Sequence, residues 1–206
     1  MTTVKGSNIY LVRCFAEKRG PTIWADVCAR LSSAERAQVE SVIASGRYPL
    51  ALQHRVFAAL EAALPRSDDD VIETFATFVA EHDLTRIHRL FLRLRNPAYT
   101  LEKSAEYWSR FYDAGTWNVT RQSSHQARGE LSGIVEKDPI FCRFLTAYIT
   151  RMFQLAGATS GKCRHTRCVV RGDKSCVFEG YWREEASAGG RPSLDARSEP
   201  PSSREQ

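Results

Sequence analysis

The sequence has no run of about 18 apolar residues, the length that a membrane-spanning helix requires. Its N-terminus also lacks the apolar stretch and the small-residue cleavage site of a secretory signal peptide. No block of Lys and Arg is longer than two residues, although the formal net charge is +5. These absences predict a cytoplasmic protein without a membrane span, and they do not favour binding to nucleic acid.

The sequence also lacks the motifs of common enzyme classes, with no Gly-rich phosphate loop, His-Glu-x-x-His motif or Ser/His/Asp set. His82 and His88 are six residues apart, so they do not share a helix face, and His54 and His125 lie in polar surroundings. An enzyme would need a general acid or base, such as His88 or Glu106, facing a cleft. We therefore expect a protein that is not an enzyme.

Apolar residues make up 43% of the 206 residues, which is enough to form a core. The six cysteines must be considered in a reducing compartment, where metal binding and plain burial are more common than disulfides. Cys14 and Cys28 lie on apolar helical faces and are expected in the core. The other four cysteines lie between residues 142 and 176.

Apolar residues at helical spacing dominate most of the chain. They predict helices within residues 7–31, 33–46, 48–63, 67–79, 84–95, 100–113 and 138–156. Arg86, Arg89 and Arg93 form a basic stripe on one of these helices, which is more typical of a solvated face than of a nucleic-acid surface.

The periodicity changes after residue 115. Alternation from Trp117 to Leu131 predicts a pair of strands, and residues 161–182 predict a hairpin. The predicted fold class is therefore α+β, with an N-terminal helical bundle packed on a small antiparallel sheet that a C-terminal Cys/His hairpin closes. Residues 1–182 form a single predicted domain. Residues 183–206, rich in Gly, Pro, Ser and charge, predict a disordered tail.

A Cys/His set at the C-terminal hairpin is the strongest candidate for a metal site. Cys168 and Cys176 bracket the predicted turn at Gly172, and a hairpin can place both on one face because strands alternate faces. His165 lies three residues before Cys168, and Cys142 lies on the preceding helix. Three Cys and one His are a standard structural zinc set, and a filled tetrahedral site leaves no position for substrate.

Plain burial remains an alternative for these cysteines. Their spacing is not a pair of Cys-x-x-Cys motifs, and Cys often serves as a small buried apolar residue. Cys163 adds a further alternative, because it could replace one of the four ligands or simply be exposed.

The segment from Cys168 to Phe178 resembles the C-terminal signature of vinyl-4-reductase-type domains, which occur as the phenol- and xylene-sensing domains of bacterial transcription activators. In that group, zinc is held by a Cys on the preceding helix, a ligand three residues before the first hairpin Cys, and two hairpin cysteines. The resemblance implies the same roles for Cys142, His165, Cys168 and Cys176. His165 departs from the acid that the phenol sensors have at its position.

Most of the chain is also similar to a family of paralogous stand-alone myxobacterial proteins. The similar stretches are residues 4–7, 48–50, 85–94, 107–113 and the terminal hairpin. In addition, Lys5-Gly6 and Trp24 resemble the start of haem-nitric-oxide-binding domains. The Tyr-x-Ser-x-Arg motif of those domains is missing, because Arg110 directly follows Ser109. On that ground the sequence predicts no haem.

The resembling sensors bind small, mostly apolar molecules between their helices and their sheet, in pockets that carry few polar groups. This resemblance implies ligand-binding roles for the aromatic and apolar residues nearest the hairpin, namely Trp108, Tyr112, Trp117, Phe141, Leu145 and Tyr148. Core packing is the common alternative for aromatic residues at helical spacing. Trp117 is the strongest candidate, since its N–H needs a partner at a helix-to-strand change.

The predicted function is therefore a non-catalytic module for small-molecule binding or signalling, with a structural zinc ion. It would form a homodimer, as related domains do, and act through a partner protein. A scaffold that keeps the fold without a ligand is the first alternative. An enzyme acting on a small hydrophobic substrate is the second, and no redox-cofactor motif supports it.

Overall fold

The structure is a computed structural model that describes residues 2–65, 70–84, 96–134, 136 and 138–183. Its helices are α1 (Ser7–Arg19), α2 (Ile23–Ala29), α3 (Ser33–Glu40), α4 (Leu50–Ala63), α5 (Val71–His82), α7 (Pro97–Phe111) and α8 (Pro139–Leu155). Its strands are β1 (Thr3–Lys5), β2 (Arg47–Pro49), β3 (Thr116–Ser123), β4 (Gln126–Ser132), β5 (Lys162–Arg167) and β6 (Cys176–Tyr181). The predicted α+β class, a helical N-terminal part on a small antiparallel sheet, is confirmed.

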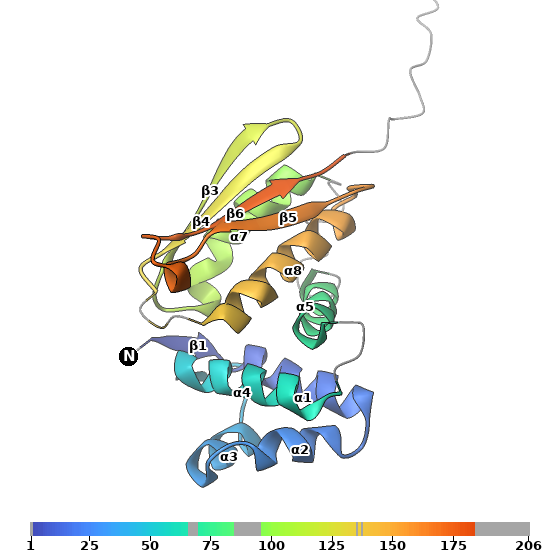
Figure 1. Ribbon diagram of the computed structural model, residues 1–206, viewed down its shortest axis with the longest axis vertical. Coiled ribbons are helices and arrows are strands. Elements are labelled where there is room, and N and C mark those ends of the chain that lie inside the picture. The colour runs from blue at the N-terminus through green and yellow to red at the C-terminus, as the bar shows by residue number, and fades with distance from the viewer. Residues whose placement is uncertain (1, 66–69, 85–95, 135, 137, 184–206) are drawn as a thin grey trace, which may run out of the picture.

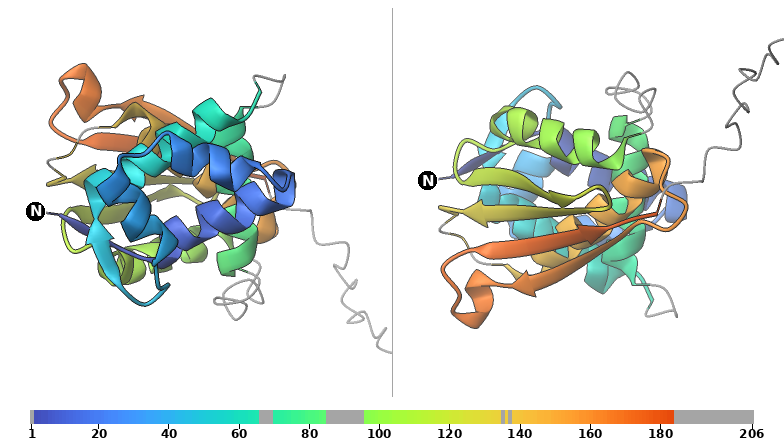
Figure 2. Two further views of the ribbon diagram at one scale, coloured as in Figure 1. Left: turned by 90° about the horizontal axis from the view of Figure 1, so that it is seen from below. Right: turned by 90° about the horizontal axis from the view of Figure 1, so that it is seen from above.

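The elements are stacked in layers (Figure 1). The sheet of β3 to β6 forms one end of the molecule, and α7 and α8 cover one of its faces (Figure 2). Helix α5 packs against α8 on the side away from the sheet, followed by α1 and α4 and then by α2 and α3. The helical layers from the N-terminal half therefore meet the sheet half along α8.

The four-stranded sheet is antiparallel, with the order β3-β4-β6-β5. Alternate residues of β4 are buried, as expected for a sheet with one face in contact with helices. Gly129 lies on this buried face, and a Cβ atom there would overlap the indole of Trp117 on β3. The sheet thus leaves space at Gly129 for the Trp117 ring.

Side-chain caps begin several of the helices. Ser32 caps α3 and accepts a hydrogen bond from the Glu35 backbone N–H at 3.4 Å. Asp70 caps α5, Asn96 caps α7 and Asp138 caps α8. A cap of this kind contributes about 1 kcal/mol and fixes the residue at which each helix begins.

The core is a continuous cluster of apolar side chains that runs from the N-terminal helices to the sheet. Phe57, Phe75 and Phe144 contact one another where α4, α5 and α8 meet. Phe153, which is fully buried, packs against Trp182 after β6. Burying one such aromatic side chain contributes about 1.5–3 kcal/mol, so α8 is held firmly between the two halves.

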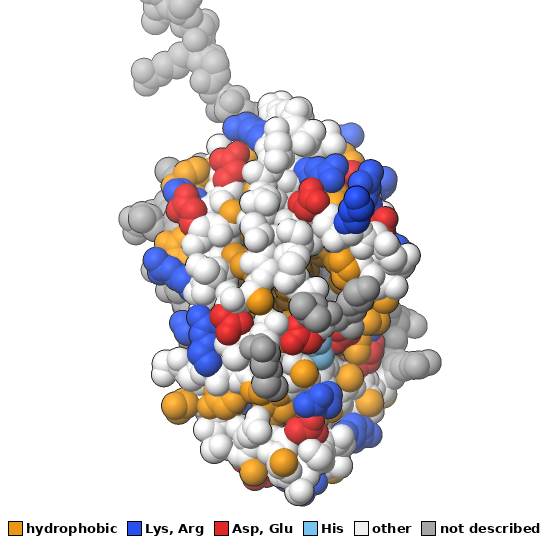
Figure 3. Space-filling view, turned by 90° about the vertical axis from the view of Figure 1, so that its left-hand side faces the viewer, with side chains coloured by type: hydrophobic (Ala, Val, Ile, Leu, Met, Phe, Trp, Pro, Cys, Tyr) orange, Lys and Arg blue, Asp and Glu red, His pale blue; other side chains and the backbone are white. Residues whose placement is uncertain are grey.

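None of the described helices is long and apolar enough to cross a membrane. Acidic and basic side chains are interspersed over the face in Figure 3, so that face gives no support to a nucleic-acid surface. The predicted basic stripe at Arg86, Arg89 and Arg93 and the predicted helix at 84–95 lie largely outside the described residues. The predicted tail, 183–206, is also outside them except for Arg183, and the single domain at 1–182 stays a prediction.

Candidate functional site

The four predicted metal ligands lie together at one end of the sheet. Cys142 comes from the first turns of α8, His165 from β5, Cys168 from the segment after β5, and Cys176 from the start of β6. Their ligand atoms all lie within 4.8 Å of one another. The Sγ atom of Cys142 is 3.8 Å from the Sγ atoms of Cys168 and of Cys176. The structure thus brings together residues from three separate elements.

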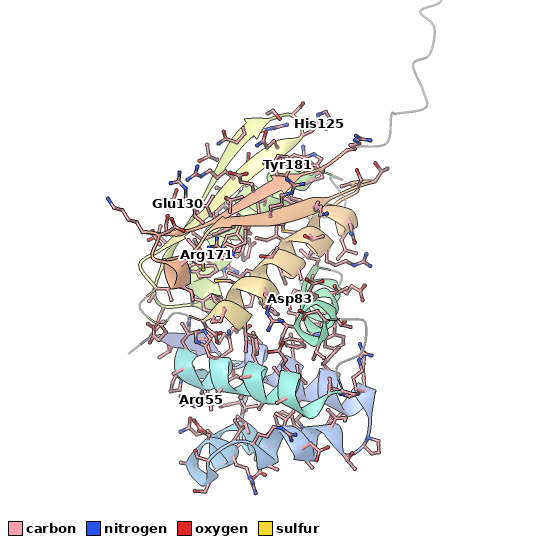
Figure 4. All side chains as sticks on the ribbon, viewed as in Figure 1. Arg55, Asp83, His125, Glu130, Arg171 and Tyr181 are labelled. Atoms are coloured by element: carbon pink, nitrogen blue, oxygen red, sulfur yellow. The ribbon has the colours of Figure 1, made fainter. Side chains whose placement is uncertain are left out.

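The loop between β5 and β6 orients the hairpin cysteines. A single turn of 3-10 helix, Val169–Arg171, follows Cys168, and Gly172 then adopts a left-handed conformation with a φ of 98°. The Asp173 carboxylate accepts a hydrogen bond from the Cys168 backbone N–H at 2.7 Å. The Val169 N–H also points at the sulfur of Cys176, at 3.5 Å. Such contacts around a ligand fix its orientation. Arg171, labelled in Figure 4, lies in this loop.

Burial controls the protonation of the cluster. It raises the pKa of the Cys142 thiol above its ordinary value, and the neighbouring Cys176 and Cys168 raise that pKa further. Burial also raises the pKa of Cys176 and lowers the pKa of His165, which favours the neutral imidazole that binds metals. Within the described part of the chain, the buried Nε2 atom of His165 has no hydrogen-bond partner.

The cluster has the size of a tetrahedral zinc site. With Zn–S bonds of about 2.3 Å, the edge between two sulfur ligands of a tetrahedron is about 3.8 Å. The two Cys142 sulfur separations have this value. The donors, three thiols and one imidazole, also match the preference of zinc for sulfur and nitrogen.

An apolar cavity of about 110 Å³ lies between α7 and α8. Trp108 and Tyr148 of the predicted ligand-binding set line it. Its other lining residues are Leu84, Thr100, Lys103, Ser104, Tyr107, Phe111 and Met152. Its wall is thus mostly aromatic and apolar, with Thr100, Lys103 and Ser104 as polar members.

A second cavity, of about 80 Å³, shares Phe111 and Tyr148 with the first and lies between the N-terminal helices and α8. Tyr112 and Leu145 of the predicted set line it together with Asn8, Val79, Asp83 and Phe144. Asp83 is almost fully buried, and burial raises the pKa of its carboxyl group. Figure 4 places Asp83 where α5 approaches α8.

The remaining predicted ligand-binding residues, Trp117 and Phe141, lie outside the lining of both cavities. The Trp117 Nε1–H donates a hydrogen bond to the Ser104 hydroxyl of α7 at 2.8 Å. The indole N–H therefore has its partner within the protein and not in a ligand. Phe141 packs against Tyr112 and Phe144 in the core. The ligand-binding roles of all six residues stay predictions.

The described histidines do not form a set for nucleophilic catalysis. His54 is 3.5 Å from Asp138, and His82 is 3.3 Å from Asp83. His88, a candidate acid or base, lies outside the described residues. Burial raises the pKa of Cys163 to about 12, so this thiol is not an activated nucleophile.

Asp83, Lys103, Ser104 and Tyr107 are cavity residues that the sequence reasoning did not select. A signal for Asp83 is present in the sequence. It follows the apolar helix α5 directly, where the helix dipole disfavours a negative charge. No comparable signal distinguishes the other three from ordinary surface residues of α7.

Comparison with solved structures finds this fold in H-NOX proteins. The Fe(II)NO form of an H-NOX protein from S. oneidensis has a TM-score of 0.67 at 12% identity, covering 87% of this chain and 99% of that chain. The unliganded Fe(II) H-NOX protein from K. algicida has a TM-score of 0.66 at 13% identity, and the match covers 88% of this chain and 98% of that chain. An oxygen-binding H-NOX domain related to soluble guanylate cyclases has a TM-score of 0.59 at 8% identity, and the match covers 87% of this chain and 93% of that chain.

No protein-family model and no curated protein matches the sequence. At these identities the structural likeness shows the fold alone. The predicted relationship to the vinyl-4-reductase-type sensors and to the myxobacterial family stays a prediction.

The comparison contradicts the prediction of no haem. One of the similar structures comes from work on heme distortion in the H-NOX family, and others carry Fe(II) ligation states. The prediction rested on the missing Tyr-x-Ser-x-Arg motif, and this chain has the fold without the motif. The absence of this motif was therefore too weak a ground for predicting no haem.

Small apolar cavities limit the space for a haem among the described residues. Their two apolar cavities measure about 110 and 80 Å³, whereas pockets for drug-sized ligands have about 300–1,000 Å³. Trp108, Tyr112 and Phe144 help to fill the space between α7 and α8. Neither of these two cavities fits a haem by itself.

Proposed function

We propose that the chain is a non-catalytic sensor domain, which binds a small, mostly apolar molecule between its helices and acts through a partner protein. The observation that carries this proposal is the apolar cavity between α7 and α8. The likeness to H-NOX proteins supports it, since an oxygen-binding H-NOX domain is among the similar structures.

The size of the cavity limits the ligand. An apolar cavity of about 150 Å³ in another helical protein stays dry and binds benzene. The cavity of about 110 Å³ here therefore suits a molecule of benzene size or smaller. Lys103 and Ser104 lie at its wall and would orient a polar substituent.

The Cys/His cluster has a structural role in this proposal. Cys142, His165, Cys168 and Cys176 would hold one Zn²⁺ as a closed tetrahedral site, and the ion would fix α8 to the hairpin. Because α8 also lines the ligand cavity, the zinc would hold one cavity wall in place. The sulfur separations of 3.8 Å support this assignment.

The wider context of the chain is part of the same proposal. The protein would be cytoplasmic and dimeric, like the vinyl-4-reductase-type sensors that its hairpin resembles. Light scattering of the purified protein tests the dimer. A monomer at micromolar concentration would contradict that part of the proposal without affecting ligand binding.

Thermal denaturation with benzene as the probe tests the ligand site. A ligand that binds only the folded state raises its stability by mass action, so benzene should raise the melting temperature of the wild type. Met152→Phe, which places a larger side chain in the cavity, should abolish the increase. Met152→Leu, which nearly conserves volume, should retain it. Equal responses of the two variants, or no response of the wild type, would favour a scaffold that binds no ligand.

A further inference from the structure

The second cavity combines a buried carboxyl group with aromatic side chains. The Asp83 side chain lines this space of about 80 Å³ together with Phe111, Tyr112, Phe144 and Tyr148. Its wall is otherwise apolar, apart from Asn8. Because Asp83 is almost fully buried, its carboxyl group has lost most of its contact with water and therefore depends on partners inside the protein.

The partners of Asp83 within the described residues are weak. His82 Nδ1 lies 3.3 Å from its Oδ1 atom, and the Tyr148 hydroxyl donates to its Oδ2 atom at 3.5 Å. Hydrogen bonds from hydroxyl groups to carboxylates are ordinarily about 2.5–2.7 Å long. A carboxylate can accept about four hydrogen bonds, so Asp83 retains capacity for a donor in the cavity.

Among the described residues, the positive groups near Asp83 do not use this hydrogen-bonding capacity. Lys5 also faces the carboxyl group electrostatically, but its ammonium lies over the ring of Phe111 at 5.7 Å and makes no ion pair with Asp83 within the described part of the chain. His82 remains partly exposed, at 30% of its side chain. Neither group fills the cavity, because neither is among its lining residues.

We propose that this cavity binds a small alkylammonium ion, whose nitrogen contacts the Asp83 carboxylate and whose alkyl part contacts the aromatic wall. The proposal goes beyond the proposed function, because it gives the domain a second ligand site, separate from the cavity between α7 and α8. Aromatic rings attract ammonium ions through their electron-rich faces, and several rings around one cation are a recurrent recognition site.

Size and charge restrict the ligand class further. A cavity smaller than one that holds benzene suits about three to five non-hydrogen atoms. An anion would be repelled by Asp83, and a neutral alcohol would leave the buried carboxylate without a compensating charge. Isopropylammonium, with four non-hydrogen atoms, meets both restrictions, and 2-propanol is its neutral counterpart of nearly equal shape.

The experiment is an NMR titration of the ¹⁵N-labelled full chain with isopropylammonium chloride. It follows the side-chain amide of Asn8 and the backbone amide of Leu145, both of which belong to cavity residues. We expect saturable shifts in the wild type, at least tenfold weaker binding in Asp83→Asn, and unchanged binding in Asp26→Asn. Asp26 is a matched control, because it is an exposed acid on the remote helix α2.

The comparison of the two probes in the wild type keeps the proposal testable even if Asp83→Asn does not fold. The proposal expects 2-propanol to bind at least tenfold more weakly than isopropylammonium. Equal binding of the two probes, or no saturable shift with isopropylammonium, overturns it. If benzene still binds between α7 and α8, the failure affects this inference alone. If benzene also does not bind, the proposed ligand-binding function is contradicted as well.

Discussion

The sulfur atoms of Cys142 and Cys176 lie 3.8 Å apart, although 34 residues separate the two cysteines in the chain. One belongs to α8, the helix between the two halves, and the other begins β6 in the middle of the sheet. A metal ion at this point would connect the helical layers to the sheet. Stability and ligand binding should therefore both respond to a change in the cluster.

Replacement of Cys168 by Ser should remove the metal. We expect wild-type protein to carry about one zinc per chain by elemental analysis and Cys168→Ser to carry almost none. Loss of a structural metal is among the most damaging changes in a protein, so the free energy of unfolding should fall by about 4 kcal/mol or more. Denaturant unfolding followed by circular dichroism measures this change.

Cys163→Ser is the matched control for that experiment. Cys163 is also a buried cysteine of the hairpin, but it does not belong to the four-residue cluster. Its replacement should leave the zinc content unchanged. Metal-free wild-type protein, or an equal loss of zinc in both variants, would contradict the assignment.

Asp83→Asn should stabilise the protein at neutral pH. Burial raises the folded-state pKa of Asp83 above its unfolded value, so the wild type loses stability as the pH rises through that folded-state pKa. Asparagine does not titrate and avoids this loss. We therefore expect Asp83→Asn to be more stable than the wild type at pH 7.

The pH dependence of this gain provides its control. The difference between Asp83→Asn and wild type should disappear below about pH 4, where the carboxyl group is protonated in both the folded and the unfolded states. Urea unfolding at a series of pH values measures it. A variant that is less stable than wild type at pH 7 would show that the contacts of Asp83 with His82 and Tyr148 outweigh its burial.

Gly129→Ala should destabilise the sheet. A Cβ atom at this position would overlap the Trp117 indole, whose Nε1–H is held by Ser104. Overpacking of this kind costs about 1–3 kcal/mol. Gly20→Ala is the control, since Gly20 has an extended backbone and its added Cβ would contact the Ile23 side chain at 3.4 Å, an ordinary van der Waals distance. Thermal unfolding that shifts equally in both variants would count against the packing of Trp117 on Gly129.

Much of the fold and the grouping of the metal ligands could be anticipated from the sequence. Helical periodicity identified α8, and the alternation after Trp117 identified β3 and β4, because each pattern reports which side of an element is buried. The short strands β1 and β2 gave no such signal. Cys142 could be grouped with the hairpin cysteines because it lies on the helix directly before the hairpin, and the resemblance supported this grouping.

The cavities could not be anticipated in the same way. Trp108 and Trp117 are both large aromatics near the hairpin, yet Trp108 lines a cavity whereas Trp117 fills the space above Gly129. Periodicity assigns a residue to the buried face, but whether that face meets a neighbour or an empty space depends on the packing of distant elements. The prediction of no haem rested on one missing motif, whereas the likeness to H-NOX proteins lies in the fold of most of the chain.

The ligand cavity between α7 and α8 can be tested most directly at Met152. The chain has two methionines, Met1 and Met152, and Met152 lines the cavity. Protein labelled with ¹³C at the methionine methyl groups should therefore give two resolved signals. On titration with benzene, the account predicts that the Met152 signal moves saturably under the ring current of the bound molecule, while the Met1 signal stays fixed. A Met152 signal that stays unchanged up to the solubility limit of benzene, in protein that remains folded, would contradict it.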